Sequence, residues 1–387
     1  VHFKLPADYL DALRTAHVLA DPVVRRVEIV HQVEATARAL DAVPAPPSVA
    51  LYDELTGLVE WPVAIHAHFD PVFLELPEAI VVTTLVHHQR FIPLRDTDGT
   101  LLPDFIAIAN LDSRDPEQIR HGLSRVVRPR LEDARFYYRR DRTQPLAAYA
   151  AALSGLQFAP KLGTMDAKSK RLSALTSRIA EVPAWPDTPA DTAIRAGELA
   201  KCDLVTGMVF EFPKLQGIIG GLYAATSESA SVAAAIAEQY LPAGAHDSLP
   251  RTPAGAALAL ADRLDTLVGG FAAGLVPNGT KDPFGLRRAA FGALRIAAGW
   301  APKLDLAPLL DLAACGYPDA LRATDVLPAV SDFLRERLRS LILDQGKRAD
   351  VAQAVLVVAP LAPGEVLLRA QALSAFGNSE HAPALAA

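Results

Sequence analysis

Three aspartates and a cysteine are candidate metal ligands in this chain. They are Cys202, Asp203, Asp262 and Asp265. Metal-assisted hydrolysis needs several nitrogen and oxygen ligands, which hold the ion and let it activate water. No histidine occurs between His121 and His246, so the stretch that contains Cys202 and Asp203 lacks nitrogen ligands and the ligand set is depleted. The sequence therefore favours helix caps, ion pairs or hydrogen bonds for the aspartates, and metal-dependent hydrolysis is the alternative.

The order of these residues looks like a degraded metal-dependent phosphohydrolase core. Enzymes of that kind combine an upstream histidine, a His-Asp pair and a distal aspartate. In this chain Cys202-Asp203 stands at the pair and Asp262 at the distal position. His87-His88 has no nearby carboxylate or thiol, and His66 and His68 alternate with apolar neighbours on one side of a predicted strand. All four histidines favour structural or surface roles.

A basic segment from Arg114 to Arg142 could contact phosphate. It holds nine arginines and five acidic residues in a chain whose net charge is −6. Arg128, Arg135, Arg139 and Arg142 are spaced to share one face of a helix, with Phe136, Tyr137 and Tyr138 interleaved. The planar guanidinium can donate two hydrogen bonds to a phosphate. A salt-bridged helix neutralised by Glu132 and Asp133 and a nucleic-acid face both remain open. The phosphate candidates are Arg128, Arg130, Arg135, Arg139 and Arg140.

Two further basic groups follow along the chain. One comprises Lys161, Lys168, Lys170 and Arg171. The other comprises Lys281, Arg287 and Arg288, at the start of a predicted helix, where backbone N–H groups and basic side chains together could hold a phosphate. In the same segment Asp282 is predicted to cap that helix, with Pro283 in its first turn.

These residues must be positioned by a small sheet and a long series of helices. Near-alternating apolar residues predict strands at Leu58–Phe69, Phe91–Leu94 and Phe105–Asn110, and the turn Asp96–Gly99 makes the last two an antiparallel pair. The first fifty residues and almost everything after Gln118 have a helical period. The helices are predicted at Glu117–Arg142, Met165–Ile179, Thr192–Met208, Ser231–Tyr240, Pro253–Gly269, Pro283–Gly299, Val326–Leu343 and Asp350–Val358.

Composition excludes several classes of protein. Apolar residues make up 51% of 387 residues, enough for a sizeable core, and no apolar run reaches the roughly 18–20 residues of a membrane helix. Two distant cysteines provide neither a disulfide framework nor a zinc site and favour a reduced, cytoplasmic protein. The spacings of a dinucleotide loop, a P-loop and a nucleophile elbow are all absent, so no ATP site is expected in this chain.

Seven motifs in a fixed order carry a resemblance to a known family, over most of Val1–Phe376. They are LVEWPVAI, HHQRFIPL, LLPDFIAIANLDSRDP, VVRPRLEDARFYYRRD, KLGTMDAKSKRL, KCDLVTGMVFEFPKLQGIIG and NGTKDPFGLRRAA. The chain closely resembles the β subunit of bacterial heterotetrameric glycyl-tRNA synthetase.

The resemblance implies an α2β2 assembly that attaches glycine to tRNA-Gly. In that family the α subunit binds ATP, with magnesium, and forms glycyl-adenylate, whereas the β subunit binds tRNA. The resemblance also implies a helical His-Asp phosphohydrolase-type domain, and the family shares the Cys202-Asp203 pattern. This chain is thus expected to bind no cofactor, to contribute no catalytic residue, and to act with the α subunit and tRNA-Gly in the cytoplasm. A metal-dependent phosphohydrolase and a pure assembly scaffold are the alternatives.

The expected fold class is α+β and predominantly helical. Residues 1–117 are predicted to form a mixed region with a small antiparallel sheet. Residues 118–300 are predicted to form the all-α His-Asp-type domain, and residues 301–387 a helical linker region. Because the family's subunit extends beyond both ends, the chain is expected to be a truncated piece without the anticodon-binding domain.

Overall fold

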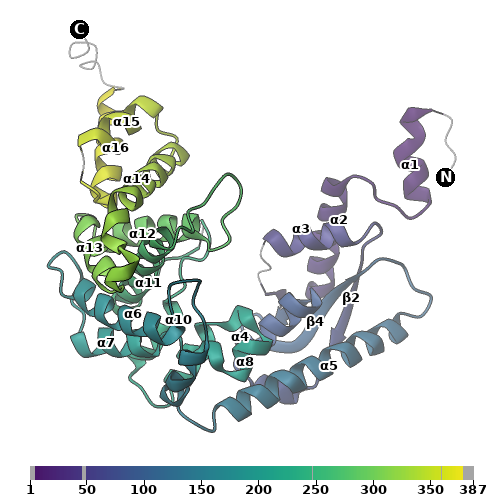
Figure 1. Ribbon diagram of the computed structural model, residues 1–387. Coiled ribbons are helices and arrows are strands. Elements are labelled where there is room, and N and C mark those ends of the chain that lie inside the picture. The colour runs from purple at the N-terminus through teal and green to yellow at the C-terminus, as the bar shows by residue number, and fades with distance from the viewer. Residues whose placement is uncertain (1–4, 46–48, 246, 359, 378–387) are drawn as a thin grey trace. The chain divides into compact units, whose positions relative to one another are not determined.

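The computed structural model describes residues 5–45, 49–245, 247–358 and 360–377, which divide into two compact units (Figure 1). The first unit comprises Val1–Thr143 with Glu211–Leu215, and the second comprises Gln144–Phe210 with Gln216–Ala387. The division follows Thr143, whereas the sequence predicted a boundary at residue 117, because the long basic helix packs with the sheet that precedes it. The outer ends of the predicted regions, residues 1–4 and 378–387, lie outside the described residues.

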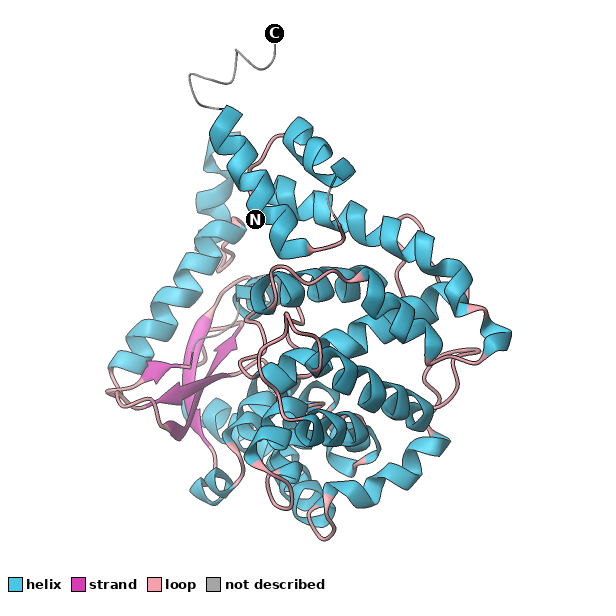
Figure 2. Ribbon diagram, turned by 90° about the vertical axis from the view of Figure 1, so that its left-hand side faces the viewer, coloured by secondary structure: helices cyan, strands magenta, loops and turns pink. Residues whose placement is uncertain are grey.

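The first unit is built on a four-stranded antiparallel sheet in the order β1-β3-β4-β2, drawn in magenta in Figure 2. Its strands are β1 (Val43–Pro44), β2 (Val63–His68), β3 (Ile92–Arg95) and β4 (Leu101–Ala109). The antiparallel pairing of β3 with β4 confirms the predicted hairpin. Gly99 has φ +89° in its turn, a conformation that glycine adopts without steric cost.

Helices cover this sheet. The core between the sheet and α2 (Pro22–Arg38) with α3 (Val49–Leu58) contains Ile29, Val33, Leu55, Ile92 and Ile106. The basic helix α5 (Pro116–Asp141) packs against β2 through its buried residues Val127, Leu131 and Ala134. Its bounds agree with the predicted helix Glu117–Arg142. The remaining helices of the unit are α1 (Tyr9–Thr15) and α4 (Glu78–Thr83), the latter continued by a π-helical turn, Thr84–His88.

The second unit is built of helices and loops, with no strand among its described residues. Helix α11 (Pro253–Ala272) lies at its centre and is buried on nearly all sides, in contact with α6 (Met165–Ala180), α10 (Ala230–Glu238), α12 (Leu286–Trp300) and α13 (Ala307–Cys315). The other helices are α7 (Ala190–Leu199), α9 (Ile218–Ala224), α14 (Leu327–Asp344), α15 (Ala349–Val358) and α16 (Pro363–Gly377). The fold class is α+β and predominantly helical, as the sequence predicted.

Two of the predicted helices differ in extent from those observed. The helix predicted at Thr192–Met208 ends at Leu199 and is followed by a 3-10 turn, Cys202–Val205, and by a short helix, α8 (Gly207–Glu211). The chain turns there because the buried Asp203 carboxylate bonds to backbone far along the chain instead of facing solvent. The helix predicted from Pro283 begins at Leu286, after Gly285 in the left-handed region. Among the described residues, no helix is both long and apolar enough to cross a membrane.

Candidate functional site

Asp262 and Asp265 lie on one face of the central helix α11. Their spacing of three residues places both carboxylates opposite α6, where Lys168 and Arg171 have the same spacing. The contact between α6 and α11 therefore joins two acids to two bases. These four side chains lie within the second unit, and none is more than a sixth exposed.

Two buried ammonium groups neutralise Asp262. Lys168 Nζ lies 2.8 Å from Asp262 Oδ1, outside hydrogen-bond geometry, and Lys201 Nζ lies 2.9 Å from Asp262 Oδ2. Lys201 also donates to Gln239 Oε1 at 2.8 Å and lies 4.2 Å from the centroid of the Tyr240 ring. Burial opposes ionisation of Asp262, but the charges of the two lysines outweigh it and hold its pKa well below the usual range.

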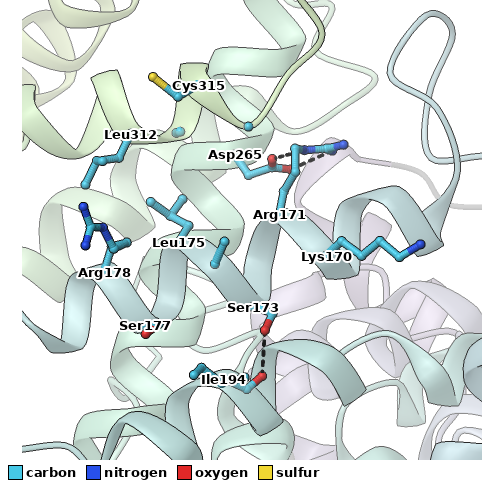
Figure 3. Close-up of a pocket in the computed structure, with 13 residues that line it drawn as sticks. Lys170, Arg171, Ser173, Leu175, Ser177, Arg178, Ile194, Asp265, Leu312 and Cys315 are labelled. Carbon is cyan, nitrogen blue, oxygen red and sulfur yellow. Dashed lines mark hydrogen bonds and ion pairs between the residues drawn. The ribbon is translucent and has the colours of Figure 1, made fainter.

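Asp265 has a separate set of partners. Lys168 Nζ donates to its Oδ2 at 2.9 Å. Arg171 Nε donates to its Oδ1 at 2.6 Å, as Figure 3 shows. The Arg171 guanidinium also lies over the ring of Tyr317, whose hydroxyl donates to the Asp265 carbonyl. Burial again opposes ionisation, and Lys168 and Arg171 lower the pKa of Asp265 despite it. The pair of carboxylates is thus ionised and compensated from three side chains.

Asp203 is fully buried and binds backbone. Its Oδ2 accepts from Gly217 N at 2.5 Å and from Gly220 N at 3.2 Å, which holds the start of α9 against the turn. Burial raises the pKa of Asp203 to about 6, against the effect of these N–H groups. The neighbouring thiol of Cys202 is also buried, and burial raises its pKa to about 12, so it is protonated at neutral pH in the free protein.

A divalent metal does not fit this cluster. A metal would need the carboxylate oxygens that the ammonium groups of Lys168 and Lys201 contact. The described residues contain no group of three or more His, Cys, Asp or Glu that could hold one. The structure thus confirms the sequence interpretation that Asp203, Asp262 and Asp265 make ion pairs and hydrogen bonds. Lys168 and Arg171, predicted as part of a basic group, are here buried and mostly buried respectively, and both are paired with Asp265.

The arginines of α5 differ in their availability. Arg128 is exposed and, within the part of the chain that the structure describes, has no ion pair or hydrogen bond from its side chain. Arg130 is half-exposed, 3.4 Å from Glu211. Arg135, by contrast, is mostly covered, donates to Glu132 at 2.5 Å and lies over the Phe73 ring. Arg128 is therefore free to bind a phosphate, whereas Arg135 is held within the unit.

The last turns of α5 combine cations with aromatic rings. Arg139 pairs with Glu75 at 2.7 Å yet keeps 62% of its side chain exposed. The Arg140 guanidinium lies 5.5 Å from the centroid of Phe136 and 4.9 Å from that of Tyr137. Phe136 is 58% exposed. The predicted common face of Arg128, Arg135, Arg139 and Arg142 thus contains both open and internally paired arginines. Both sequence interpretations, a salt-bridged helix and a basic surface, describe part of it.

At the predicted phosphate site at the start of α12, groups of the chain itself already make most of the hydrogen bonds that a phosphate would make. Asp282 caps the helix as expected, but from a position before Gly285, accepting from Leu286 N and Arg287 N at 2.9 Å each. Arg287 Nη2 donates to the Gly279 carbonyl at 2.6 Å and so holds the preceding loop. A phosphate would have to displace the Asp282 carboxylate. Lys281 and Arg288 are exposed and remain open to an external anion.

The family comparison agrees with the ordered motifs of the sequence. The model of the family described as "Glycyl-tRNA synthetase beta subunit" matches residues 1–357. The chain belongs to the glycyl-tRNA synthetase β-subunit family.

Curated members of this family match almost the whole chain. The glycine–tRNA ligase beta subunit of Chromohalobacter salexigens is 47% identical over 381 residues, which is 98% of this chain and 55% of the relative. That of Pseudomonas aeruginosa is 44% identical over 389 residues, covering 100% of this chain and 56% of the relative. That of Pseudomonas putida is 44% identical over 386 residues. The chain spans about half the length of the curated relatives it matches.

Sequence reasoning did not identify the lysines that compensate the acids in this member of the glycyl-tRNA synthetase β-subunit family. Lys168 is far from Asp262 in sequence and was grouped with neighbouring surface bases, and Lys201 received no role. One signal was available: a lysine directly precedes Cys202-Asp203, in a region that holds carboxylates without histidines. Buried carboxylates without metal ligands require cations from the protein itself.

Proposed function

We propose that this chain is a tRNA-binding, non-adenylating part of the β subunit of a glycine–tRNA ligase. In this proposal it holds tRNA-Gly in the cytoplasm while an α subunit, with ATP and magnesium, forms glycyl-adenylate and transfers glycine, in an α2β2 assembly. Family membership supports the proposal. The single structural observation that carries it is the open cationic surface of α5, where Arg128 has no partner among the described residues and Arg139 and Arg140 remain half or more exposed.

The chemistry of this surface suits RNA. Guanidinium groups bind phosphate oxygens in a planar, two-pronged geometry, and an exposed ring such as Phe136 offers a face on which an unpaired base can stack. No group of the buried cluster is placed to attack a substrate, because Asp262 and Asp265 are occupied by lysine and arginine. The proposal therefore assigns this chain binding and positioning and leaves bond formation to the α subunit.

We further propose that the second unit descends from a His-Asp-type phosphohydrolase domain that has lost its metal. Lys201, next to Cys202-Asp203, contacts Asp262, so the positions that correspond to the His-Asp pair and the distal aspartate lie close together. The predicted ranges 118–300 for this domain and 301–387 for a helical linker belong to the same proposal, with α5 assigned by its packing to the first unit.

The test is binding of a tRNA-Gly transcript by this chain across a series of salt concentrations. Phosphate contacts make the logarithm of affinity fall linearly with the logarithm of salt concentration, with a slope of about −0.7 to −0.9 for each neutralised phosphate. Arg128→Ala should weaken binding and reduce the slope by about one contact. Arg38→Ala on α2, which removes another exposed arginine without a described partner, is the matched control.

The outcomes separate the proposal from its rivals. Salt-dependent binding that is weakened by Arg128→Ala and unchanged by Arg38→Ala supports a tRNA-binding surface on α5. Absence of tRNA binding, both by this chain and by its complex with an α subunit, would leave an assembly scaffold as the function. Stoichiometric metal with phosphodiester turnover would establish the hydrolase and refute the proposed role.

A further inference from the structure

A second basic cluster in the first unit lies at an irregular turn after α4. The π-helical turn Thr84–His88 places His87 and His88 at its end, and Arg90 follows in the left-handed region with φ +58°. Phe91 N donates to the Leu85 carbonyl at 2.9 Å and closes the turn. Single π-helical turns within α-helices occur often at functional sites, and a non-glycine residue at positive φ stores strain that the surroundings must maintain.

Three cations from different segments gather around these two histidines. Arg90 Nη1 donates to the His87 carbonyl at 2.5 Å, and Arg90 Nε donates to Glu54 on α3 at 2.7 Å. Lys214 acts electrostatically on His87, and Arg130 of α5 acts on His88. All of these residues belong to the first unit, which includes Glu211–Leu215. The cluster is therefore a property of one compact unit.

One of the two histidine rings is held by packing against an aromatic side chain. The ring of His88 stacks on Phe212, with centroids 4.9 Å apart and planes at 20°. Within the part of the chain that the structure describes, neither imidazole has a hydrogen-bond partner on its ring nitrogens. Lys214 is exposed and likewise has no described ion-pair partner. The ring nitrogens of His87 and His88 and the ammonium of Lys214 therefore have no hydrogen-bond or ion-pair partner among the described residues.

The charge balance of the cluster favours an anion. Among the described residues, Arg90 pairs with Glu54 and Arg130 with Glu211, whereas Lys214 has no described ion-pair partner. Partial burial lowers the pKa of both histidines, and the neighbouring cations lower it further, with Lys214 the largest for His87 and Arg130 the largest for His88. The opposing effects come from Glu54 and Glu211 and are outweighed. The free rings are therefore harder to protonate than an ordinary histidine.

We propose that His87, His88, Arg90, Arg130 and Lys214 form a proton-linked contact for the RNA phosphodiester backbone, separate from the Arg128 contact on α5. The proposal rests on the proposed tRNA-binding function and adds a site and a mode of regulation to it. A bound phosphate places negative charge beside both rings, so the rings take up protons and then donate hydrogen bonds to phosphate oxygens. Arg130, at the edge of this cluster on α5, extends the basic surface of that helix towards the turn.

This arrangement determines the direction in which RNA affinity changes with pH. Phosphate raises the pKa of the histidines, so the bound state holds more protons than the free state over the interval between the two pKa values. Affinity for RNA must then rise as pH falls through that interval and level off below the pKa of the free protein. A histidine whose pKa rises by about one unit on binding contributes a tenfold gain in affinity.

The experiment measures tRNA-Gly binding by this chain from pH 8.0 to pH 5.5 at constant ionic strength. The variants are His87→Asn with His88→Asn together, and His87→Asn alone, because His88 also packs on Phe212 and the single variant retains that contact. His31→Asn, an exposed histidine on α2 of the same unit, is the control. The wild type and the control should gain about 3- to 10-fold in affinity over this range beyond the double variant, with the single variant between them.

A second readout follows the histidine ring protons of the wild type by NMR, with and without the transcript. The pKa of His87 should rise in the complex. An equal pH dependence in wild type and double variant, or a His87 pKa that RNA leaves unchanged, overturns the proposal while tRNA binding itself stands. Loss of all RNA binding in the wild type at every pH overturns the proposed function, and this inference with it.

Discussion

The ammonium nitrogen of Lys168 lies 2.8 Å from Asp262 Oδ1, and only 3% of the lysine side chain is exposed. A charge that is buried this completely is stable only beside an opposite charge. The same nitrogen is 2.9 Å from Asp265 Oδ2, so one cation joins two carboxylates on successive turns of α11. The pairing ties α6 to the central helix of the second unit and decides how that unit responds to substitution.

Lys168→Met should destabilise the second unit strongly. The substitution leaves Asp262 with Lys201 and Asp265 with Arg171, each carboxylate losing one buried partner, and removal of one member of a buried ion pair costs about 3–5 kcal/mol. Lys170→Met, two residues along the same helix, removes an exposed pair with Asp166 and should change stability by less than about 1 kcal/mol. Urea unfolding of both variants checks the contrast. Equal effects would mean that the buried pair contributes no more than a surface pair.

The stability of the Asp203→Asn variant relative to the wild type should increase as pH rises. The folded-state pKa of Asp203, about 6, lies above its value in the unfolded chain, so the folded state binds more protons between these values. Its contribution to stability is full below about pH 4 and is lost as pH rises through 6. Asparagine still accepts from Gly217 and Gly220 but cannot ionise. Relative to wild type, the variant should gain up to about 3 kcal/mol between pH 4 and pH 7.5, measured by denaturant unfolding at each pH. A difference that is independent of pH would refute the assignment.

Gly292→Ala should destabilise α12 where it crosses α11. A methyl group at Gly292 would collide with Nε of Arg263, whose guanidinium is held by the carbonyls of Gln239, Ala259, Tyr240 and Pro242. Because Arg263 cannot move without losing those bonds, the expected cost is about 1–3 kcal/mol. Gly122→Ala on α5 meets no atom within 4 Å and should instead stabilise by about 0.5–1 kcal/mol, as alanine does in a helix. Thermal unfolding of the two variants should show shifts of opposite sign.

The two cysteines should differ in reactivity towards a thiol reagent. Cys202 is buried and its pKa is raised to about 12, whereas Cys315 is exposed. With a reagent that releases a chromophore when it modifies a thiol, the folded protein should release one equivalent quickly. The denatured protein should release two equivalents. Cys315→Ser should remove the fast equivalent. Rapid modification of Cys202 in that folded variant would contradict its burial.

Local patterns in the sequence predicted the elements that depend on local forces. The hairpin of β3 and β4 follows from alternating apolar residues and a glycine at positive φ, and α5 follows from a helical period that runs over two dozen residues. The absence of histidine near Asp203 and Asp262 predicted ion pairs and hydrogen bonds instead of metal binding. These conclusions need only residue types and short spacings.

Long-range partners could not be predicted in the same way. Helical period favoured one helix across Thr192–Met208, but the buried bonds of Asp203 to Gly217 and Gly220 break it, and they form only in the folded chain. Similarly, Arg135 and Arg128 look equivalent in sequence, yet Glu75 and Phe73 cover only the first. The partner of a charged residue depends on tertiary contacts that spacing does not encode.

The counter-charges of Asp262 and Asp265 are covalently part of the chain. A protein that neutralises such acids with calcium, magnesium or zinc has a stability that follows the concentration of the free ion and is lowered by a chelator. Here the compensating positive charges come from Lys168, Lys201 and Arg171, whose positions beside the carboxylates are set by the fold. The carboxylate charges on α11 are therefore neutralised as the chain folds. This neutralisation does not depend on the concentration of free metal ions around the protein.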